Sequence, residues 1–115
     1  MLKHMFKMQK AFQDRVDTRY KDPSLKERSA FLRDHTIFCE QELHEMLYEV
    51  PFFKHWKDYS NVDSEAALEK AKEELIDAWH FFMNISIGLG MDADEFYKRY
   101  LSKHKINIER QDNGY

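Results

Sequence analysis

The sequence has only one cysteine, two prolines and three glycines among its 115 residues. Cys39 has no second cysteine with which to form an internal disulfide, so we expect a reducing compartment, the cytoplasm. So few glycines and prolines argue against a sheet-rich or disordered chain. No apolar run approaches the roughly 18 residues of a membrane-spanning helix, and the net charge of −3 provides no basic surface for nucleic acid. We therefore expect no membrane and no nucleic acid partner.

Apolar residues are plentiful, at 43% of the chain, so residues 1–115 are expected to form a single domain with its own core. Apolar positions recur at three- and four-residue steps and predict an all-α fold, a compact bundle of four to five helices. The expected helices span about 1–20, 24–49, 65–87 and 93–105. Side chains suited to capping precede the last three: Ser24, Asp63 or Ser64, and Asp92. The pattern leaves open a bend in the second helix.

The third predicted helix carries an acidic and aromatic stripe. Glu74, Asp77, Phe81 and Asn84 recur at i, i+3, i+7 and i+10, with His80 beside them and apolar residues along the neighbouring face. Two carboxylates at the border of an apolar face are costly to bury unless a cation compensates them, and hard divalent metals take oxygen ligands. The alternative is that both acids are solvated on the surface.

A second acidic stripe lies on the second predicted helix, where Glu42, Glu45 and Glu49 are spaced i, i+3 and i+7. If the second and third helices pack antiparallel, the two stripes place four carboxylates around one small volume. Like charges gathered so closely raise each other's pKa and repel, unless one or two Mg²⁺ ions bind between them. A solvated acidic face is again the alternative.

Two segments supply basic and aromatic groups. Lys54 and Trp56 follow the second helix and could contact a phosphate and a base, or the aromatics could simply close the end of a small core. Near the end of the chain, Lys103, Asn107 and Arg110 suit a triphosphate, with a frayed polar terminus as the alternative.

Four ordered blocks of residues together resemble one enzyme family. They are Met8-Gln9-x-x-Phe12; Glu42-x-x-Glu45 followed by Glu49 and Phe53-Lys54-x-Trp56; Glu74-x-x-Asp77-x-x-His80-Phe81-Phe82; and Lys103-x-x-x-Asn107-x-x-Arg110-Gln111-x-x-Gly114-Tyr115. The chain resembles the all-α nucleoside triphosphate pyrophosphatases, specifically the dimeric dUTPases and the related dCTP pyrophosphatases of T-even phages. The resemblance covers nearly the whole chain, although this chain is shorter than the usual dimeric dUTPases.

The resemblance implies a Mg²⁺-dependent reaction in which a metal-activated water attacks the triphosphate and releases pyrophosphate. The implied metal ligands are Glu42, Glu45, Glu74 and Asp77. The general base would be one of Glu42, Glu45 and Glu49, and we favour Glu45. This agrees with what phosphoryl chemistry demands, namely positioning, charge neutralisation and an activated water.

The resemblance also implies how the deoxynucleotide is held. Gln9 would contact the base, with Trp56 and Asn84 as further substrate contacts, and His80 and Phe81 would hold the deoxyribose beside Asp77. The implied phosphate contacts are Lys54, Lys103, Asn107, Arg110 and Tyr115. A domain this small with exposed aromatics is expected to pair with a second copy, as a homodimer or a dimer-based oligomer.

The leading hypothesis is a pyrimidine deoxynucleoside triphosphate pyrophosphatase that acts on dUTP. A phage-type dCTP pyrophosphatase is the first alternative, because it shares the third and fourth blocks. A helical interaction module without catalysis is the second. A carboxylate-bridged di-iron protein is a third, suggested by Asp77-x-x-His80, but it requires a pair of Glu-x-x-His motifs that this sequence lacks.

Overall fold

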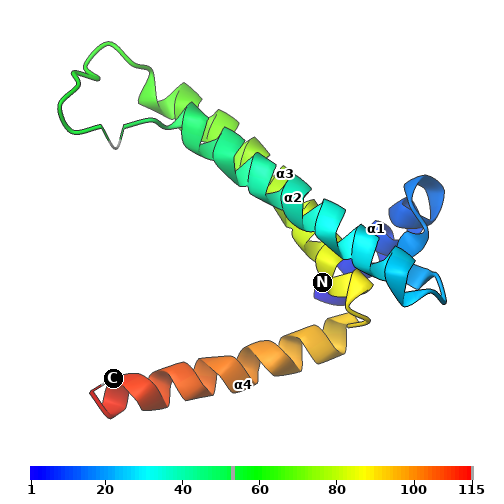
Figure 1. Ribbon diagram of the computed structural model, residues 1–115. Coiled ribbons are helices and arrows are strands. Elements are labelled where there is room, and N and C mark those ends of the chain that lie inside the picture. Colours follow the sequence, from blue (N-terminus) through cyan, green and yellow to red (C-terminus); the bar gives the residue numbers. More distant parts are fainter. Residues whose placement is uncertain (53, 115) are drawn as a thin grey trace.

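A computed structural model describes residues 1–52 and 54–114, and these residues are all-α (Figure 1). The elements are α1 (Leu2–Val16), a short 3-10 helix η1 (Arg19–Lys21), α2 (Leu25–Glu49), α3 (Ser64–Gly88) and α4 (Ala93–Asp112). The predicted all-α class is confirmed. Phe53 and Tyr115, which the sequence assigned to two of the motifs, lie outside the described residues. Within the described residues, no helix combines the length and apolar character needed to cross a membrane.

The helix boundaries differ from the sequence prediction at two places. α1 ends at Val16, because Asp17 is extended and its carboxylate accepts a hydrogen bond from the Arg19 backbone N–H at 3.2 Å. α4 continues to Asp112, since its second half contains no glycine or proline to end it. α2 runs unbroken through the region where a bend had been left open.

Side-chain caps begin three of the helices as the sequence predicted. Ser24 Oγ accepts from the Glu27 backbone N–H at 3.5 Å. The Asp63 carboxylate accepts from Ala66 at 3.0 Å, and that of Asp92 accepts from Glu95 at 2.8 Å. Each cap satisfies a backbone donor that the first helical turn leaves without an intrahelical partner.

The long helices α2 and α3 lie side by side and antiparallel, joined by the connection 50–63 (Figure 1). α1 crosses them near the start of α2, and α4 leaves the end of α3 and extends away from the pair (Figure 1). The molecule is accordingly elongated, with extents of 53 × 44 × 28 Å.

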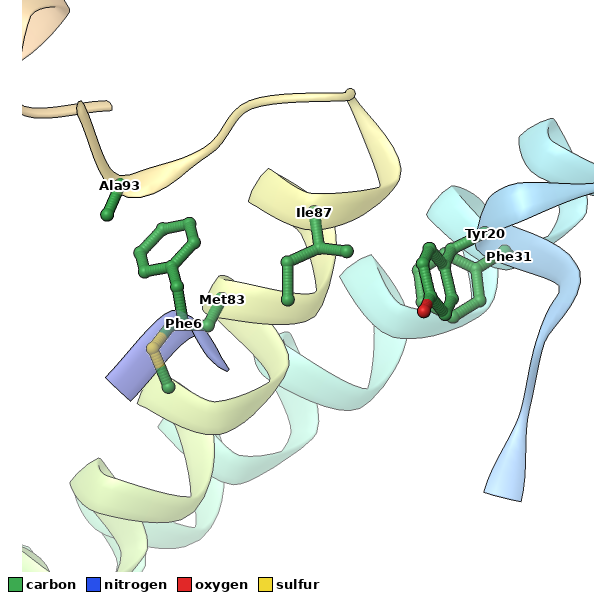
Figure 2. Packing of buried hydrophobic residues seen from close by; sticks show 6 residues of the cluster. All are labelled: Phe6, Tyr20, Phe31, Met83, Ile87 and Ala93. Carbon is green, nitrogen blue, oxygen red and sulfur yellow. The ribbon is translucent and has the colours of Figure 1, made fainter. Parts of the chain in front are cut away.

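A small apolar core lies where the ends of the helices meet. Its buried residues come from every helical element: Phe6, Tyr20, Phe31, Met83, Ile87 and Ala93 (Figure 2). Phe31 is fully buried, and its ring centroid lies 5.7 Å from that of Tyr20. Farther along the α2–α3 pair, several apolar residues of α2 remain partly exposed, because two helices alone cannot enclose them; these are Ile37, Phe38, Leu43 and Leu47.

Gly88 is packed so closely against α2 that its replacement tests this core. A Cβ at position 88 would lie 2.8 Å from Leu32 Cδ2 and 3.0 Å from the buried Phe31 ring. We expect Gly88→Ala to lower the free energy of unfolding by about 1–3 kcal/mol, because the Phe31 ring has no space into which to move. Urea unfolding measures this change, with the exposed substitution Ser102→Ala as control. Equal stability of the two variants would contradict the close packing.

Candidate functional site

The antiparallel contact of α2 with α3 gathers three carboxylates. Glu42 and Glu45 of α2 and Glu74 of α3 each offer an oxygen, and these oxygens all lie within 4.8 Å of one another. Asp77 is near enough to act electrostatically on Glu42 and Glu74, but it is not one of the three. Glu49 is half-buried farther along α2 and also lies outside this acidic cluster. We call Glu42, Glu45 and Glu74 the acidic cluster.

Burial and crowding make this cluster unfavourable for the bare protein. Burial, together with the adjacent carboxylates of Glu74 and Glu45, raises the pKa of Glu42 to about 7. Its Oε2 atom is buried and has no hydrogen-bond partner among residues 1–52 and 54–114. The pKa of Glu74 is raised as well: its hydrogen bond with Glu42 lowers it, but desolvation and the charges of Glu45 and Asp77 outweigh that contact. Crowded carboxylate oxygens with an unpartnered buried atom fit a hard divalent cation, which takes oxygen ligands.

A cavity of about 280 Å³ lies beside the cluster, between α1, α2 and α3. Glu42 and Asp77 form its acidic wall, and the rest of its lining comes from amide, imidazole and aromatic side chains: Gln9, Phe12, Gln13, His80, Phe81 and Asn84. An apolar cavity of about 300 Å³ adjoins it and shares Gln9, Phe12 and His80. The structure thus brings together the predicted base, sugar and metal residues of three helices.

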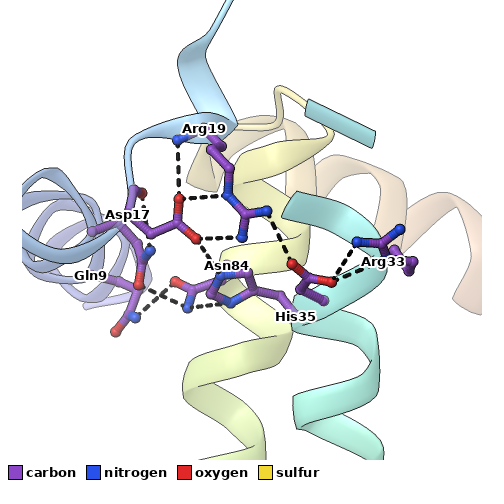
Figure 3. Close-up of polar contacts among 8 residues, drawn as sticks. Gln9, Asp17, Arg19, Arg33, His35 and Asn84 are labelled. Carbon is purple, nitrogen blue, oxygen red and sulfur yellow. Dashed lines mark hydrogen bonds and ion pairs between the residues drawn. The ribbon is translucent and has the colours of Figure 1, made fainter. Parts of the chain in front are cut away.

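Four hydrogen-bonded side chains form a buried polar floor next to this cavity: Gln9, Gln13, His35 and Asn84 (Figure 3). Asn84 Oδ1 accepts from Gln9 Nε2 at 2.8 Å, and Asn84 Nδ2 donates to Gln13 Oε1 at 3.0 Å. The same Asn84 nitrogen lies 3.2 Å from His35 Nδ1. All four residues are buried, and Asn84 is only 2% exposed. Buried amides are retained at such density only when their donors and acceptors are matched.

A charged layer supports the floor from outside. His35 Nε2 lies 3.4 Å from Asp17 Oδ2, Arg19 binds the Asp17 carboxylate at 2.7 Å, and Arg19 also reaches Asp34 at 3.0 Å (Figure 3). Hydrogen bonding to Arg19 lowers the pKa of Asp17 to about 2, and burial lowers the pKa of His35. Asp17 is therefore ionised and His35 neutral at neutral pH.

Sequence reasoning assigned no role to Asp17, Arg19 or His35. The one available signal was a histidine among the apolar positions of α2, between Phe31 and Phe38. That signal is weak, because a histidine in such a place is usually a hydrogen-bonded core residue.

Among the described residues, the predicted phosphate contacts are not assembled within one chain. Lys54 lines a different cavity, of about 240 Å³, beside His44 and Pro51, and Trp56 is 70% exposed. Lys103, Asn107 and Arg110 are exposed on α4, which extends away from α2 and α3 (Figure 1). The role that the sequence suggested for these residues stays a prediction.

Replacing Glu42 by Gln should change how the stability of the metal-free protein depends on pH. The Glu42 carboxyl has a pKa of about 7 in the folded protein against an ordinary 4.5, so the folded state retains a proton that the unfolded state releases. This contribution to the free energy of unfolding is complete below pH 4.5 and is lost as the pH rises through 7. Glu42→Gln should remove that loss.

Urea unfolding with EDTA at about pH 5.5 and about pH 7.5 tests this, with Glu73→Gln at an exposed position as control. The comparison between variants is needed because the buried neutral His35 acts in the opposite direction, losing stability as the pH falls. A pH dependence of Glu42→Gln identical to that of the unmodified protein would contradict the raised pKa.

Comparison with known proteins assigns the sequence of this chain to a family. The pattern of the dUTPase family matches residues 1–91, which include α1, α2, α3, the acidic cluster and the cavity. No solved structure matches the chain.

Curated relatives come from phages. The dCTP pyrophosphatase of Enterobacteria phage T4 is 57% identical over 44 residues, which are 38% of this chain and 26% of the relative. The dCTP pyrophosphatase of Enterobacteria phage LZ5 is 44% identical over 71 residues, 55% of this chain and 41% of the relative. A DNA replication protein of phage T4 is 44% identical over 43 residues, 36% of this chain and 11% of the relative. The chain thus spans less than half the length of each relative. The family pattern matches most of the length of the chain and confirms the resemblance seen in its motifs. The chain therefore belongs to the dUTPase family.

Proposed function

We propose that this chain carries the catalytic core of a divalent-metal-dependent pyrimidine deoxynucleoside triphosphate pyrophosphatase. The observation that carries the proposal is the acidic cluster beside a cavity with a polar amide floor. The phage relatives are named dCTP pyrophosphatases, so we place dCTP ahead of the dUTP that the sequence analysis preferred. The reaction is hydrolysis of the bond between the α and β phosphates, giving the nucleoside monophosphate and pyrophosphate.

Glu42, Glu45 and Glu74 would hold a Mg²⁺ ion, with Asp77 as a further ligand. When bound, the ion would neutralise charge on the triphosphate and make water a better nucleophile. Glu45 is exposed, whereas Glu42 and Glu74 are half-buried, so Glu45 is the carboxylate with freedom to accept a proton from the attacking water. The water oxygen bonds to phosphorus as pyrophosphate leaves.

The cavity would receive the nucleoside. Gln9 and Asn84 place hydrogen-bonding groups at its floor, where they can read the edge of a pyrimidine. His80 and Phe81 line the side next to Asp77 and would contact the deoxyribose. The polar floor and the acidic wall lie on the same cavity, so one substrate can reach both.

A carboxylate-bridged di-iron site is not favoured. Among the described residues, the group that could hold a metal consists of three glutamates and contains no histidine. His80 lines the nucleotide cavity instead of joining the cluster.

A second copy of the chain would complete the molecule. Apolar side chains of α3 remain exposed along one face, including Leu75, Ile76, Trp79 and Phe82, and α4 adds Tyr97 and Tyr100. Exposed apolar residues of this kind are typical of a surface buried between subunits. In a homodimer or a dimer-based oligomer, α4 of one copy could also bring Lys103, Asn107 and Arg110 to the substrate of the other. A cytoplasmic location remains a prediction from cysteine usage.

Pyrophosphate release from dCTP, dUTP, dTTP and dATP, each with Mg²⁺ and with EDTA, tests the proposed reaction. We expect turnover that EDTA abolishes, highest for dCTP and next for dUTP. Glu45→Gln should lower kcat by about 100-fold or more, because it removes the proposed proton acceptor and a metal ligand together. Glu40→Gln, at an exposed position of the same helix, is the matched control. Full activity of Glu45→Gln, or no turnover of any pyrimidine, would refute the assignment.

Ile76→Glu should convert the proposed dimer to a monomer, because Ile76 is 53% exposed on the apolar face of α3. Light scattering after size-exclusion chromatography gives the mass directly. Leu25→Glu introduces the same charge at an exposed site on α2, away from the exposed apolar side chains of α3 and α4. It should leave the mass of the assembly unchanged. A monomeric unmodified protein would contradict the proposal.

A further inference from the structure

The Gln9 carboxamide is held in one orientation by its hydrogen bond to Asn84. A carboxamide has an accepting oxygen and a donating nitrogen, and a protein can hold either end toward a ligand. Cytosine presents an amino donor beside the N3 acceptor, whereas uracil presents the O4 acceptor beside the N3–H donor. A carboxamide held in one orientation at the edge of the base therefore matches one of these two orders and opposes the other.

Two groups of Asp17 can only accept hydrogen bonds: its backbone carbonyl oxygen and its ionised carboxylate. Gln13 Nε2 donates to the backbone oxygen at 3.3 Å, so Gln13 Oε1 faces Asn84. His35 Nε2 lies 3.4 Å from the carboxylate and must carry the ring proton to donate to it. The neutral ring then has a lone pair on Nδ1, which faces Asn84. Two independent paths from Asp17 thus end in acceptors for the same Asn84 nitrogen.

The orientation of Asn84 follows from these two acceptors and sets that of Gln9. With Nδ2 directed at Gln13 and His35, Asn84 has only Oδ1 left for Gln9, and it accepts from Gln9 Nε2 at 2.8 Å. Turning the Asn84 carboxamide over would place its nitrogen against the Gln9 nitrogen, and turning the Gln9 carboxamide over would place its oxygen against the Asn84 oxygen. Either mismatch at a buried contact is costly. Arg19 holds Asp17 in place through bonds of 2.7 and 3.0 Å to its two carboxylate oxygens.

We propose that His35, anchored on Asp17, is a positioning residue for base selectivity. Together with Gln13, it fixes the direction of the Asn84 and Gln9 carboxamides. The Gln9 oxygen and its remaining N–H can then pair with only one of the two pyrimidine edges. The inference rests on the proposed function, because it assigns the choice of base at that same cavity. His35 belongs neither to the acidic cluster nor to the lining of the cavity, so we expect its replacement to act on selectivity.

The test compares kcat/KM for dCTP with kcat/KM for dUTP in two His35 variants. His35→Leu removes one of the two acceptors for the Asn84 nitrogen. We expect the ratio of the two kcat/KM values to move about tenfold closer to unity. His35→Gln can still donate to Asp17 and accept from Asn84, so it should restore most of the ratio. Tyr20→Phe loses the hydrogen bond from the Tyr20 hydroxyl to Asp14 and serves as a control for general loss of stability.

A second measurement reads the network without catalysis. ¹⁵N NMR of the unmodified protein at neutral pH should show His35 neutral with its proton on Nε2. A proton on Nδ1, or a charged ring, would overturn the proposed direction of the network. An unchanged substrate ratio in His35→Leu, in a protein that hydrolyses both nucleotides, would overturn the selectivity role while leaving the proposed function intact. Absence of turnover in the unmodified protein would overturn the function itself, and selectivity with it.

Discussion

The close antiparallel contact between α2 and α3 is the constraint on which the rest of the structure depends. It brings Glu42 and Glu45 within a few ångströms of Glu74, at a separation where like charges repel strongly. Apolar packing at the ends of the two helices opposes that repulsion, with Gly88 allowing α3 to approach Phe31 without a side chain between them. The fold therefore holds its carboxylates in a crowded state, which favours binding a cation over leaving the acids bare.

Beside this charged region, the protein uses amides and one imidazole where a small helical domain would ordinarily place apolar side chains. Gln9, Gln13, His35 and Asn84 are all buried at the junction of three helices. Gln9, Gln13 and His35 each make a hydrogen bond with Asn84, and Gln9 keeps its oxygen and one N–H for the cavity. The apolar core is correspondingly small, and the junction gains a defined pattern of donors and acceptors facing a cavity.

The elongated shape connects these local features to assembly. Two helices packed only on each other cannot enclose the apolar side chains along their length, and α4 contributes little cover because it extends away (Figure 1). The exposed apolar face of α3 and the exposed cations of α4 are thus two aspects of one arrangement. Both are accounted for if another copy packs against α3 and receives α4.

The sequence by itself determined the all-α class, the caps at Ser24 and Asp92, and the two acidic stripes, because these follow from short-range periodicity and capping chemistry. It also carried the motifs of the family. The antiparallel packing of α2 on α3 decided that the two stripes face each other. Only the tertiary structure showed that Asp17, Arg19 and His35 support Gln9 and Asn84, since that network joins residues up to 75 positions apart and has no repeating spacing. Likewise, the path of α4 away from the cavity depends on how the chain leaves Gly88, which no pattern within α4 could reveal.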